Sequence, residues 1–122
     1  MSRRFVILLH EVPASAERAT HWDLMLEFGD KLRTWALADE PKCDSEIDAD
    51  ILPDHRLAYL EYEGPISRNR GVVTRVEAGT YSIIRHDEQT LAVTLSGENL
   101  RCDVEIASLD SKRAQVTFGE QG

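Results

Sequence analysis

The segment from His21 to Phe28, which reads HWDLMLEF, alternates between two kinds of side chain with a period of two residues. Its even-numbered positions are all apolar, whereas its odd-numbered positions include His21, Asp23 and Glu27. A period of two is typical of a β-strand, in which successive side chains point to opposite faces. The pattern therefore predicts a strand over 20–28 that carries His21 and Asp23 close together on one face.

The same period recurs along the chain, and no segment longer than a few residues shows a helical period. Gly29-Asp30 suits a two-residue hairpin turn that leads into an antiparallel partner strand over 31–38. Gly79 is expected to form a turn or a bulge. Further strands are expected over 5–10, 56–62, 71–76, 80–85, 91–95, 100–106 and 114–118. About eight strands separated by turn residues predict an all-β fold, either an antiparallel barrel or a sandwich.

An acidic stretch interrupts this pattern between the strands expected over 31–38 and 56–62. Its only lysine or arginine is Lys42, and its carboxylates are those of Asp39, Glu40, Asp44, Glu46, Asp48, Asp50 and Asp54. Connections of this length in small domains are often functional or mobile. We therefore expect one long acidic loop that ends near Pro53, with a single helical turn over 45–50.

The chain length and the cysteine pattern limit the classes of protein to which this chain can belong. The length of 122 residues predicts a single domain over residues 1–122. No apolar run approaches the roughly 18 residues needed to cross a bilayer, and the N-terminal apolar stretch is too short for a signal peptide. Cys43 and Cys102 match no metal-ligand spacing. We expect a cytoplasmic protein with no membrane partner.

The net charge of −8 disfavours nucleic-acid binding, which usually needs a basic face. Arginines are nevertheless frequent outside the acidic stretch, at positions 33, 56, 68, 70 and 75. Two interpretations stay open. Either the charge is segregated into an acidic loop and a basic cleft, or both sets are ordinary solvated surface.

Three of the four histidines lie at the ends or on the faces of expected strands. His10 closes the apolar run FVILLH, His21 shares a strand face with Asp23, and His55 lies in the segment PDHRLAY. An imidazole beside a carboxylate can bind a divalent metal ion or act as an oriented acid–base pair. The alternative is a purely structural pair at the rim of the fold. His86 is expected to be an exposed turn residue.

Five short segments form a distinctive combination: FVILLH, HWDLMLE, KLRTWAL, DHRLAYLEYEG and GTY. This combination resembles the 3′-phosphoesterase domain of bacterial DNA ligase D, here as a stand-alone single-domain protein. The resemblance covers nearly the whole chain. The matching residues are His10, His21, Asp23, Glu27, Trp35, His55, Tyr59, Glu63-Gly64 and Gly79-Thr80-Tyr81.

The resemblance implies a compact β-barrel that acts as a metal-dependent phosphoesterase, typically with manganese. Such domains trim a 3′-terminal ribonucleoside or a 3′-phosphate from the primer strand of a DNA primer-template and leave a 3′-hydroxyl. The implied process is the repair of DNA by end joining. Because the chain contains neither an adenylating ligase domain nor a polymerase domain, such a role would require ligase or polymerase partners in trans.

The resemblance also implies roles for individual residues. The metal would be held by His10, His21 and Asp23. His55 would contact or protonate the scissile phosphate, with Tyr59 assisting. Two alternatives stay open for Glu27, which either braces a metal ligand or faces solvent.

The chain departs from the family pattern near the metal site. Met25 stands where the family has an arginine two residues after the metal-site aspartate, and Leu8 replaces a polar residue. A methionine cannot clamp a phosphate as a charged guanidinium does, so we expect Met25 to serve packing. Either phosphate binding has been lost or redirected, or another arginine supplies the charge. The candidates are Arg68, Arg70, Arg56 and Arg33.

Three functions therefore stay open. The first is metal-dependent trimming of nucleic-acid 3′ ends. The second is a non-catalytic relative that binds a metal or a nucleic-acid end, which the methionine and the negative charge favour. The third is a phosphoesterase for a small phosphorylated metabolite, which would suit an acidic protein.

Overall fold

The computed structural model describes residues 3–121, which form nine strands and one single-turn 3-10 helix. The strands are β1 (Arg3–Glu11), β2 (His21–Phe28), β3 (Lys31–Leu37), β4 (Ser45–Arg56), β5 (Gly64–Pro65), β6 (Val72–His86), β7 (Thr90–Gly97), β8 (Arg101–Ser108) and β9 (Arg113–Gln121). The 3-10 helix η1 spans Leu57–Leu60. Nowhere in residues 3–121 is a helix long and apolar enough to cross a membrane.

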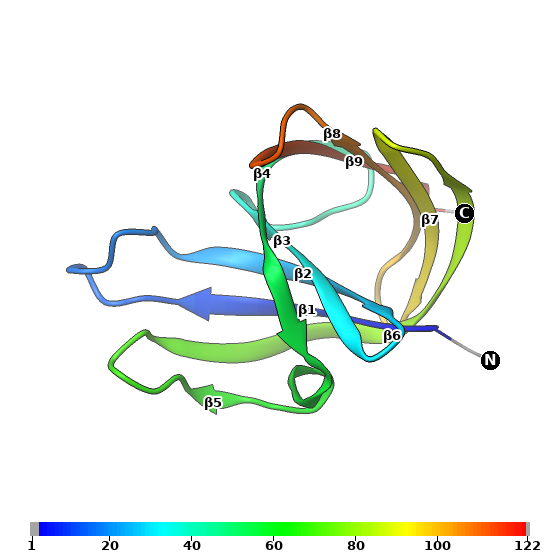
Figure 1. Cartoon of the computed structure of the whole chain (residues 1–122). Helices are drawn as coiled ribbons and strands as arrows, with labels where there is room; N and C mark the ends of the chain where they lie inside the picture. Colours follow the sequence, from blue (N-terminus) through cyan, green and yellow to red (C-terminus); the bar gives the residue numbers. More distant parts are fainter. Residues whose placement is uncertain (1–2, 122) are drawn as a thin grey trace.

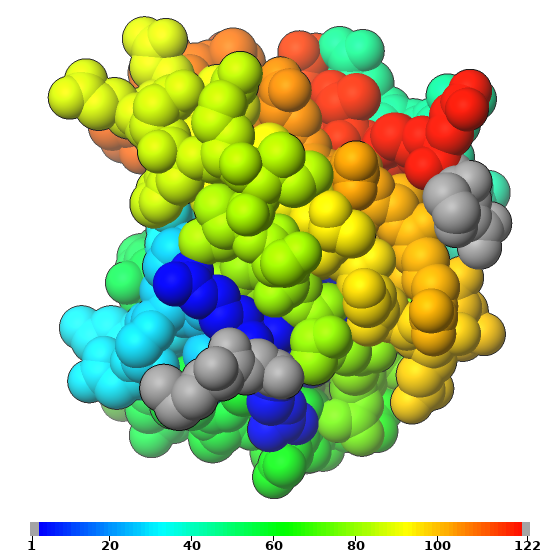
Figure 2. Space-filling view, turned by 90° about the vertical axis from the view of Figure 1, so that its right-hand side faces the viewer, coloured from blue at the N-terminus to red at the C-terminus, as the bar shows by residue number. Residues whose placement is uncertain are grey.

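Eight of these strands close into an antiparallel barrel (Figure 1). The order around the barrel is β1-β2-β3-β4-β9-β8-β7-β6, and β6 pairs with β1 to complete the ring. Figure 2 shows the start of β1 (dark blue) between the β2–β3 hairpin (cyan) and β6 (lime). The short strand β5 pairs with the start of β6 outside the ring. The predicted all-β antiparallel barrel is confirmed.

The interior of the barrel is one apolar cluster to which all eight strands contribute. On β2 the even-numbered residues Leu24 and Leu26 point inward and are fully buried, as the alternation predicts. Trp35 of β3, Phe5 of β1 and Phe118 of β9 are the largest fully buried side chains in the same cluster. Burial of each such side chain stabilises the fold by about 1.5–3 kcal/mol.

A second apolar cluster lies on the outer face of the barrel. It consists of Val6, Leu8, Met25, Leu32, Leu60 and Val73, with Leu57, Tyr59, Ile66 and Ala78 packed against it. Because η1 and the residues after β5 cover this face, β1 is buried on both sides and reads as a continuous apolar run. Met25 is 1% exposed in this cluster, so its predicted packing role is confirmed.

The prediction of a long acidic loop up to Pro53 is wrong, because most of that segment is strand β4. Ile47 and Ala49 are buried in the barrel interior and pair with Val116 and Ala114 of β9. The acidic residues of β4 alternate with them on the outer face, so only residues 38–44 connect β3 to β4. The helical turn expected over 45–50 is absent for the same reason.

The strand expected over 56–62 is also wrong, since residues 57–60 form η1. Leu57 and Leu60 are three residues apart, and this spacing places them on one side of a 3-10 turn. Both contact the outer apolar cluster. The sequence has the right apolar residues, but their partner is the outer face of the barrel rather than a neighbouring strand.

The two strands expected over 71–76 and 80–85 are a single strand, β6. Gly79 does not interrupt it but lies between Phe5 of β1 and Gly97 of β7. A Cβ atom at this position would lie 2.1 Å from the carbonyl oxygen of Ser96, so glycine permits the close approach of β7. The irregularity in the pairing with β1 lies instead near Val76, between the partners of Ile7 and Leu8.

Candidate metal centre and anion pocket

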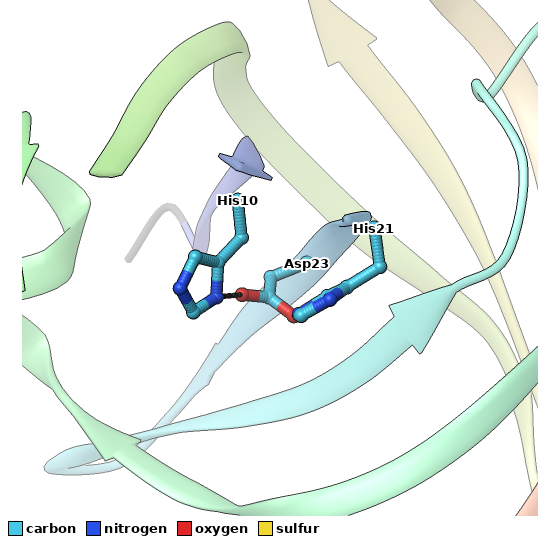
Figure 3. Close-up of side chains that lie close together, drawn as sticks. All are labelled: His10, His21 and Asp23. Carbon is cyan, nitrogen blue, oxygen red and sulfur yellow. Dashed lines mark ion pairs between the residues drawn. The ribbon is translucent and has the colours of Figure 1, made fainter. Parts of the chain in front are cut away.

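Two histidines and one aspartate form a compact trio on the outer face of β1 and β2. His10, near the end of β1, pairs directly with His21, the first residue of β2, and Asp23 follows two residues later. One potential ligand atom from each side chain lies within 4.8 Å of the others. Figure 3 shows the Asp23 carboxylate between the two imidazole rings. The structure thus brings together the three predicted metal ligands.

The hydrogen bonds of the two imidazoles determine which nitrogen of each ring faces Asp23. His10 Nε2 lies 2.8 Å from the carbonyl oxygen of Arg70, and His21 Nδ1 lies 2.8 Å from that of Ala19. Because a carbonyl oxygen only accepts, both nitrogens donate a proton. His10 Nδ1 and His21 Nε2 therefore face Asp23, at 3.6 and 3.0 Å.

The three groups perturb one another's titration. Burial raises the pKa of Asp23, but the imidazoles of His10 and His21 beside the carboxylate outweigh this and leave the pKa below its ordinary value. The nearby Asp23 carboxylate raises the pKa of His10 and outweighs the lowering by burial. The trio therefore favours a carboxylate at Asp23 together with positive charge at or beside His10.

The trio fits a divalent metal ion by its donor atoms and by its surroundings. Asp23 Oδ1 is buried and, although 3.0 Å from His21 Nε2, has no well-oriented hydrogen-bond partner among residues 3–121. A cation between the carboxylate and the two inward-facing nitrogens would satisfy all three groups. Two imidazoles and one carboxylate suit ions such as Mn²⁺, Fe²⁺ or Zn²⁺. Backbone acceptors on the outer imidazole nitrogens are typical of metal-bound histidines.

A pocket of about 310 Å³ lies beside the trio on the His10 side. Its charged lining residues are Arg56 and Arg70, and Tyr59, Tyr62 and Ile66 contribute aromatic and apolar wall. Arg70 links the two sites, because its carbonyl oxygen accepts the hydrogen bond from His10. With two guanidinium groups and no carboxylate in its lining, the pocket suits an anion.

His55 lies next to this pocket, in contact with Tyr59. The two rings are edge to face with centroids 5.5 Å apart, and the Tyr59 ring contacts Tyr62 in the same way at 5.9 Å. His55 Nδ1 lies 3.0 Å from the carbonyl oxygen of Pro53 and donates to it, which leaves Nε2 available to a ligand. The structure therefore groups His55, Tyr59 and two of the predicted arginines.

The loop that carries Arg70 is tightly folded. Arg68 and Asn69 both have left-handed backbone conformations, with φ of 63° and 55°. The Arg70 guanidinium donates to the Ser67 carbonyl oxygen and hydroxyl at 2.9 and 3.0 Å. Arg68 lies exposed in this turn and is not among the residues that line the pocket.

Two predicted residues lie away from the trio. Arg33 is on the opposite face of β3, where its guanidinium stacks over the rings of Phe28 and Trp35 at 5.2 and 5.0 Å. Glu27 lies four residues along β2 from Asp23, and its carboxylate accepts a hydrogen bond from the Arg4 backbone. Neither is brought to the candidate metal ligands.

Most of the chain matches a known protein family. The family described as the DNA ligase D 3′-phosphoesterase domain matches residues 13–108. The chain belongs to this family. His21, Asp23, His55 and Tyr59 of this phosphoesterase domain lie inside the matched segment, and His10 lies three residues before it. No curated protein matches the chain.

Sequence reasoning missed the groups that orient the two imidazoles of the phosphoesterase domain. The carbonyl oxygens of Ala19 and Arg70 perform this task. A main-chain carbonyl leaves no signature in the residue type, and the contact of Arg70 with His10 spans 60 positions. Only the position of Ala19, two residues before His21, could have suggested such a contact.

Proposed function

We propose that this protein is a metal-dependent phosphoesterase that trims nucleic-acid 3′ ends during DNA end joining. The observation that supports this best is the trio, in which two imidazoles oriented by backbone carbonyls face one buried carboxylate. Membership of the DNA ligase D 3′-phosphoesterase family agrees with it. The substrate is a DNA primer-template end with a 3′-phosphate or a 3′-ribonucleotide, and ligase or polymerase partners act in trans.

In this proposal His10, His21 and Asp23 hold a divalent ion, Mn²⁺ first among candidates. The ion would polarise a phosphoryl oxygen and lower the pKa of a water molecule. Asp23 stays ionised near neutral pH because its pKa is lowered. The Arg70 and Ala19 carbonyls keep the lone pairs of both imidazoles directed at the centre of the trio.

The pocket residues would bind and protonate the phosphate. Arg56 and Arg70 supply the positive charge. Met25, at the position of the family arginine, is buried in the outer apolar cluster and supplies none. His55 Nε2 is the atom that contacts or protonates a phosphate oxygen, because Nδ1 is occupied by Pro53. Tyr59 packs edge to face on His55 and limits its rotation.

A turnover assay tests this proposal. Metal-stripped protein is incubated with a primer-template that carries a 3′-phosphate or one 3′-ribonucleotide, with and without Mn²⁺. We expect Mn²⁺-dependent trimming that His21→Ala abolishes. His86→Ala is the matched control, because His86 contacts Phe28 rather than the trio, and it should leave trimming intact. Absence of trimming in the wild type with bound Mn²⁺ would contradict the proposal.

Two alternatives have specific support. A non-catalytic metal-binding or end-binding relative is favoured by Met25, since its 1% exposure removes that position from any phosphate contact. A small phosphorylated metabolite as substrate is favoured by the net charge of −8 and by the exposed Glu46 and Asp48 on β4. The salt dependence of binding separates the two substrate classes, because a nucleic-acid strand bound through several phosphates loses affinity steeply as the salt concentration rises.

Free thiols at Cys43 and Cys102 suit the cytoplasmic location that we propose.

A further inference from the structure

The connection between β1 and β2 ends directly at the metal ligand His21. Ala19, two residues earlier, accepts the hydrogen bond from His21 Nδ1 at 2.8 Å. The base of the connection is closed by a bond from the Val12 amide to the Thr20 hydroxyl at 3.2 Å. The position of the Ala19 carbonyl, and with it the orientation of the imidazole, depends on how this connection is anchored.

One side chain anchors the connection to the far side of the site. The Arg18 guanidinium forms an ion pair and hydrogen bond with the Asp50 carboxylate on β4. Asp50 lies two strands from Asp23, since Asp23 pairs with Ala36 and Ala36 pairs with Asp50. The small Ala36 side chain leaves room for the ion pair over β3.

The same residues surround a pocket of about 300 Å³ on the His21 side of the trio. Arg18, His21, Ala36 and Asp50 all contribute to its lining, together with Arg113 of β9. The ion pair and the imidazole are therefore parts of one local structure. The carbonyl that fixes the imidazole belongs to the residue next to Arg18.

We propose that Arg18 is a positioning residue for the metal ligand His21. Its ion pair with Asp50 holds the Ala19 carbonyl where it accepts the proton of His21 Nδ1, so that Nε2 stays directed at Asp23. This inference rests on the proposed metal site but concerns a residue outside the metal ligands and outside the phosphate pocket.

Replacement of Arg18 would have opposite effects on metal affinity depending on whether Arg18 acts through its charge or through its ion pair with Asp50. A guanidinium near the trio repels a divalent cation, so removal of its charge alone would strengthen metal binding. Loss of the anchor weakens metal binding because His21 becomes free to rotate away. Arg113 is the matched control: it lines the same pocket, it is exposed like Arg18, and it forms no ion pair within residues 3–121.

The test is titration calorimetry with Mn²⁺ on the wild type, Arg18→Gln, Arg18→Lys and Arg113→Gln. We expect Arg18→Gln to weaken binding about two- to fivefold, the range that a solvent-exposed ion pair supports. Arg18→Lys should restore most of the affinity, and Arg113→Gln should leave it unchanged or slightly tighter. Equal or tighter binding by Arg18→Gln would overturn the inference.

A metal-free measurement separates this inference from the proposed function. The His21 Nδ1–H proton, which donates to the Ala19 carbonyl oxygen, should be visible by NMR and protected from exchange with water in the wild type. Arg18→Gln should accelerate its exchange, whereas Arg113→Gln should not. If the wild type binds no Mn²⁺, the metal site is wrong, and the exchange measurement still decides the role of Arg18. An unchanged exchange rate in Arg18→Gln would contradict it.

Discussion

The two histidines of the trio are held in different ways. His21 is 7% exposed at its side chain and is oriented by a carbonyl two residues earlier in the chain. His10 is 19% exposed and is oriented by the Arg70 carbonyl, which a separate loop brings against the end of β1. The orientation of His21 depends on local backbone geometry, and that of His10 depends on the docking of a distant segment. The pocket that suits an anion lies on the His10 side.

Replacement of Asp23 by asparagine should have the largest effect, because it removes the group that both histidines share. We expect Mn²⁺ affinity to fall more than about 100-fold, beyond the 10–100-fold that loss of a supporting group costs. Titration calorimetry measures the change. Glu46→Gln, which removes an exposed carboxylate on β4, is the control for net charge. Equal losses in both variants would show that Asp23 is not a ligand.

Replacement of Gly71 by alanine should disturb the His10 side alone. Gly71 has φ of 106°, and a Cβ atom there would lie 2.1 Å from the Glu11 carbonyl oxygen. The loop must shift and carry the Arg70 carbonyl away from His10. We expect a loss of about 1–3 kcal/mol in the free energy of unfolding from the backbone strain, and metal affinity about 10-fold or more lower.

Gly29→Ala is the matched control for Gly71→Ala. Gly29 also has a positive φ, 63°, but a Cβ atom there would have nothing within 4 Å. We expect a loss of about 1–2 kcal/mol in stability and no change in metal affinity. A normal metal affinity in Gly71→Ala would show that the Arg70 carbonyl does not orient His10.

Replacement of Arg56 by glutamine tests whether phosphate binds in the pocket on the His10 side. Loss of one charge-assisted bond of about 1.5–3 kcal/mol should weaken binding of inorganic phosphate roughly 10-fold or more. Arg113→Gln, in the pocket beside His21, should leave phosphate binding unchanged. Metal affinity should be similar in both. Equal weakening in the two variants would place the phosphate elsewhere.

The pH dependence should follow His10, whose pKa is raised above 6.5. Its contribution to the stability of the metal-free protein is present below 6.5 and is lost as pH rises through the raised value. The contribution of Asp23, whose pKa is lowered, is present above 3.8 and is lost as pH falls through the lowered value.

Metal binding follows the opposite trend at His10, because the proton and the ion compete for Nδ1. Below the raised pKa, Mn²⁺ affinity should rise with pH by up to about tenfold per unit for one competing proton. The rise should level off at a pH above 6.5. Calorimetry between pH 5.5 and 8.5 measures it, and a flat profile would exclude His10 as a ligand.

The alternation of residues 21–28 was sufficient to predict β2 and the shared face of His21 and Asp23. Strand β4 was not predicted because acidic side chains dominate its outer face, and its inward-facing residues are only Ile47, Ala49 and the partly buried Ile51. The resemblance pointed to His10 and His55, and the structure places both near the expected partners. The roles of Arg18 and of the Arg70 carbonyl depend on tertiary contacts that residue types do not encode.

Anomalous diffraction from crystals grown with Mn²⁺ shows whether the trio holds a metal ion. We expect one ion bound by His10 Nδ1, His21 Nε2 and an Asp23 carboxylate oxygen, with His10 Nε2 still donating to the Arg70 carbonyl oxygen and His21 Nδ1 to that of Ala19. The absence of an anomalous peak at the trio, or a peak held only by the acidic side chains of β4, would contradict it.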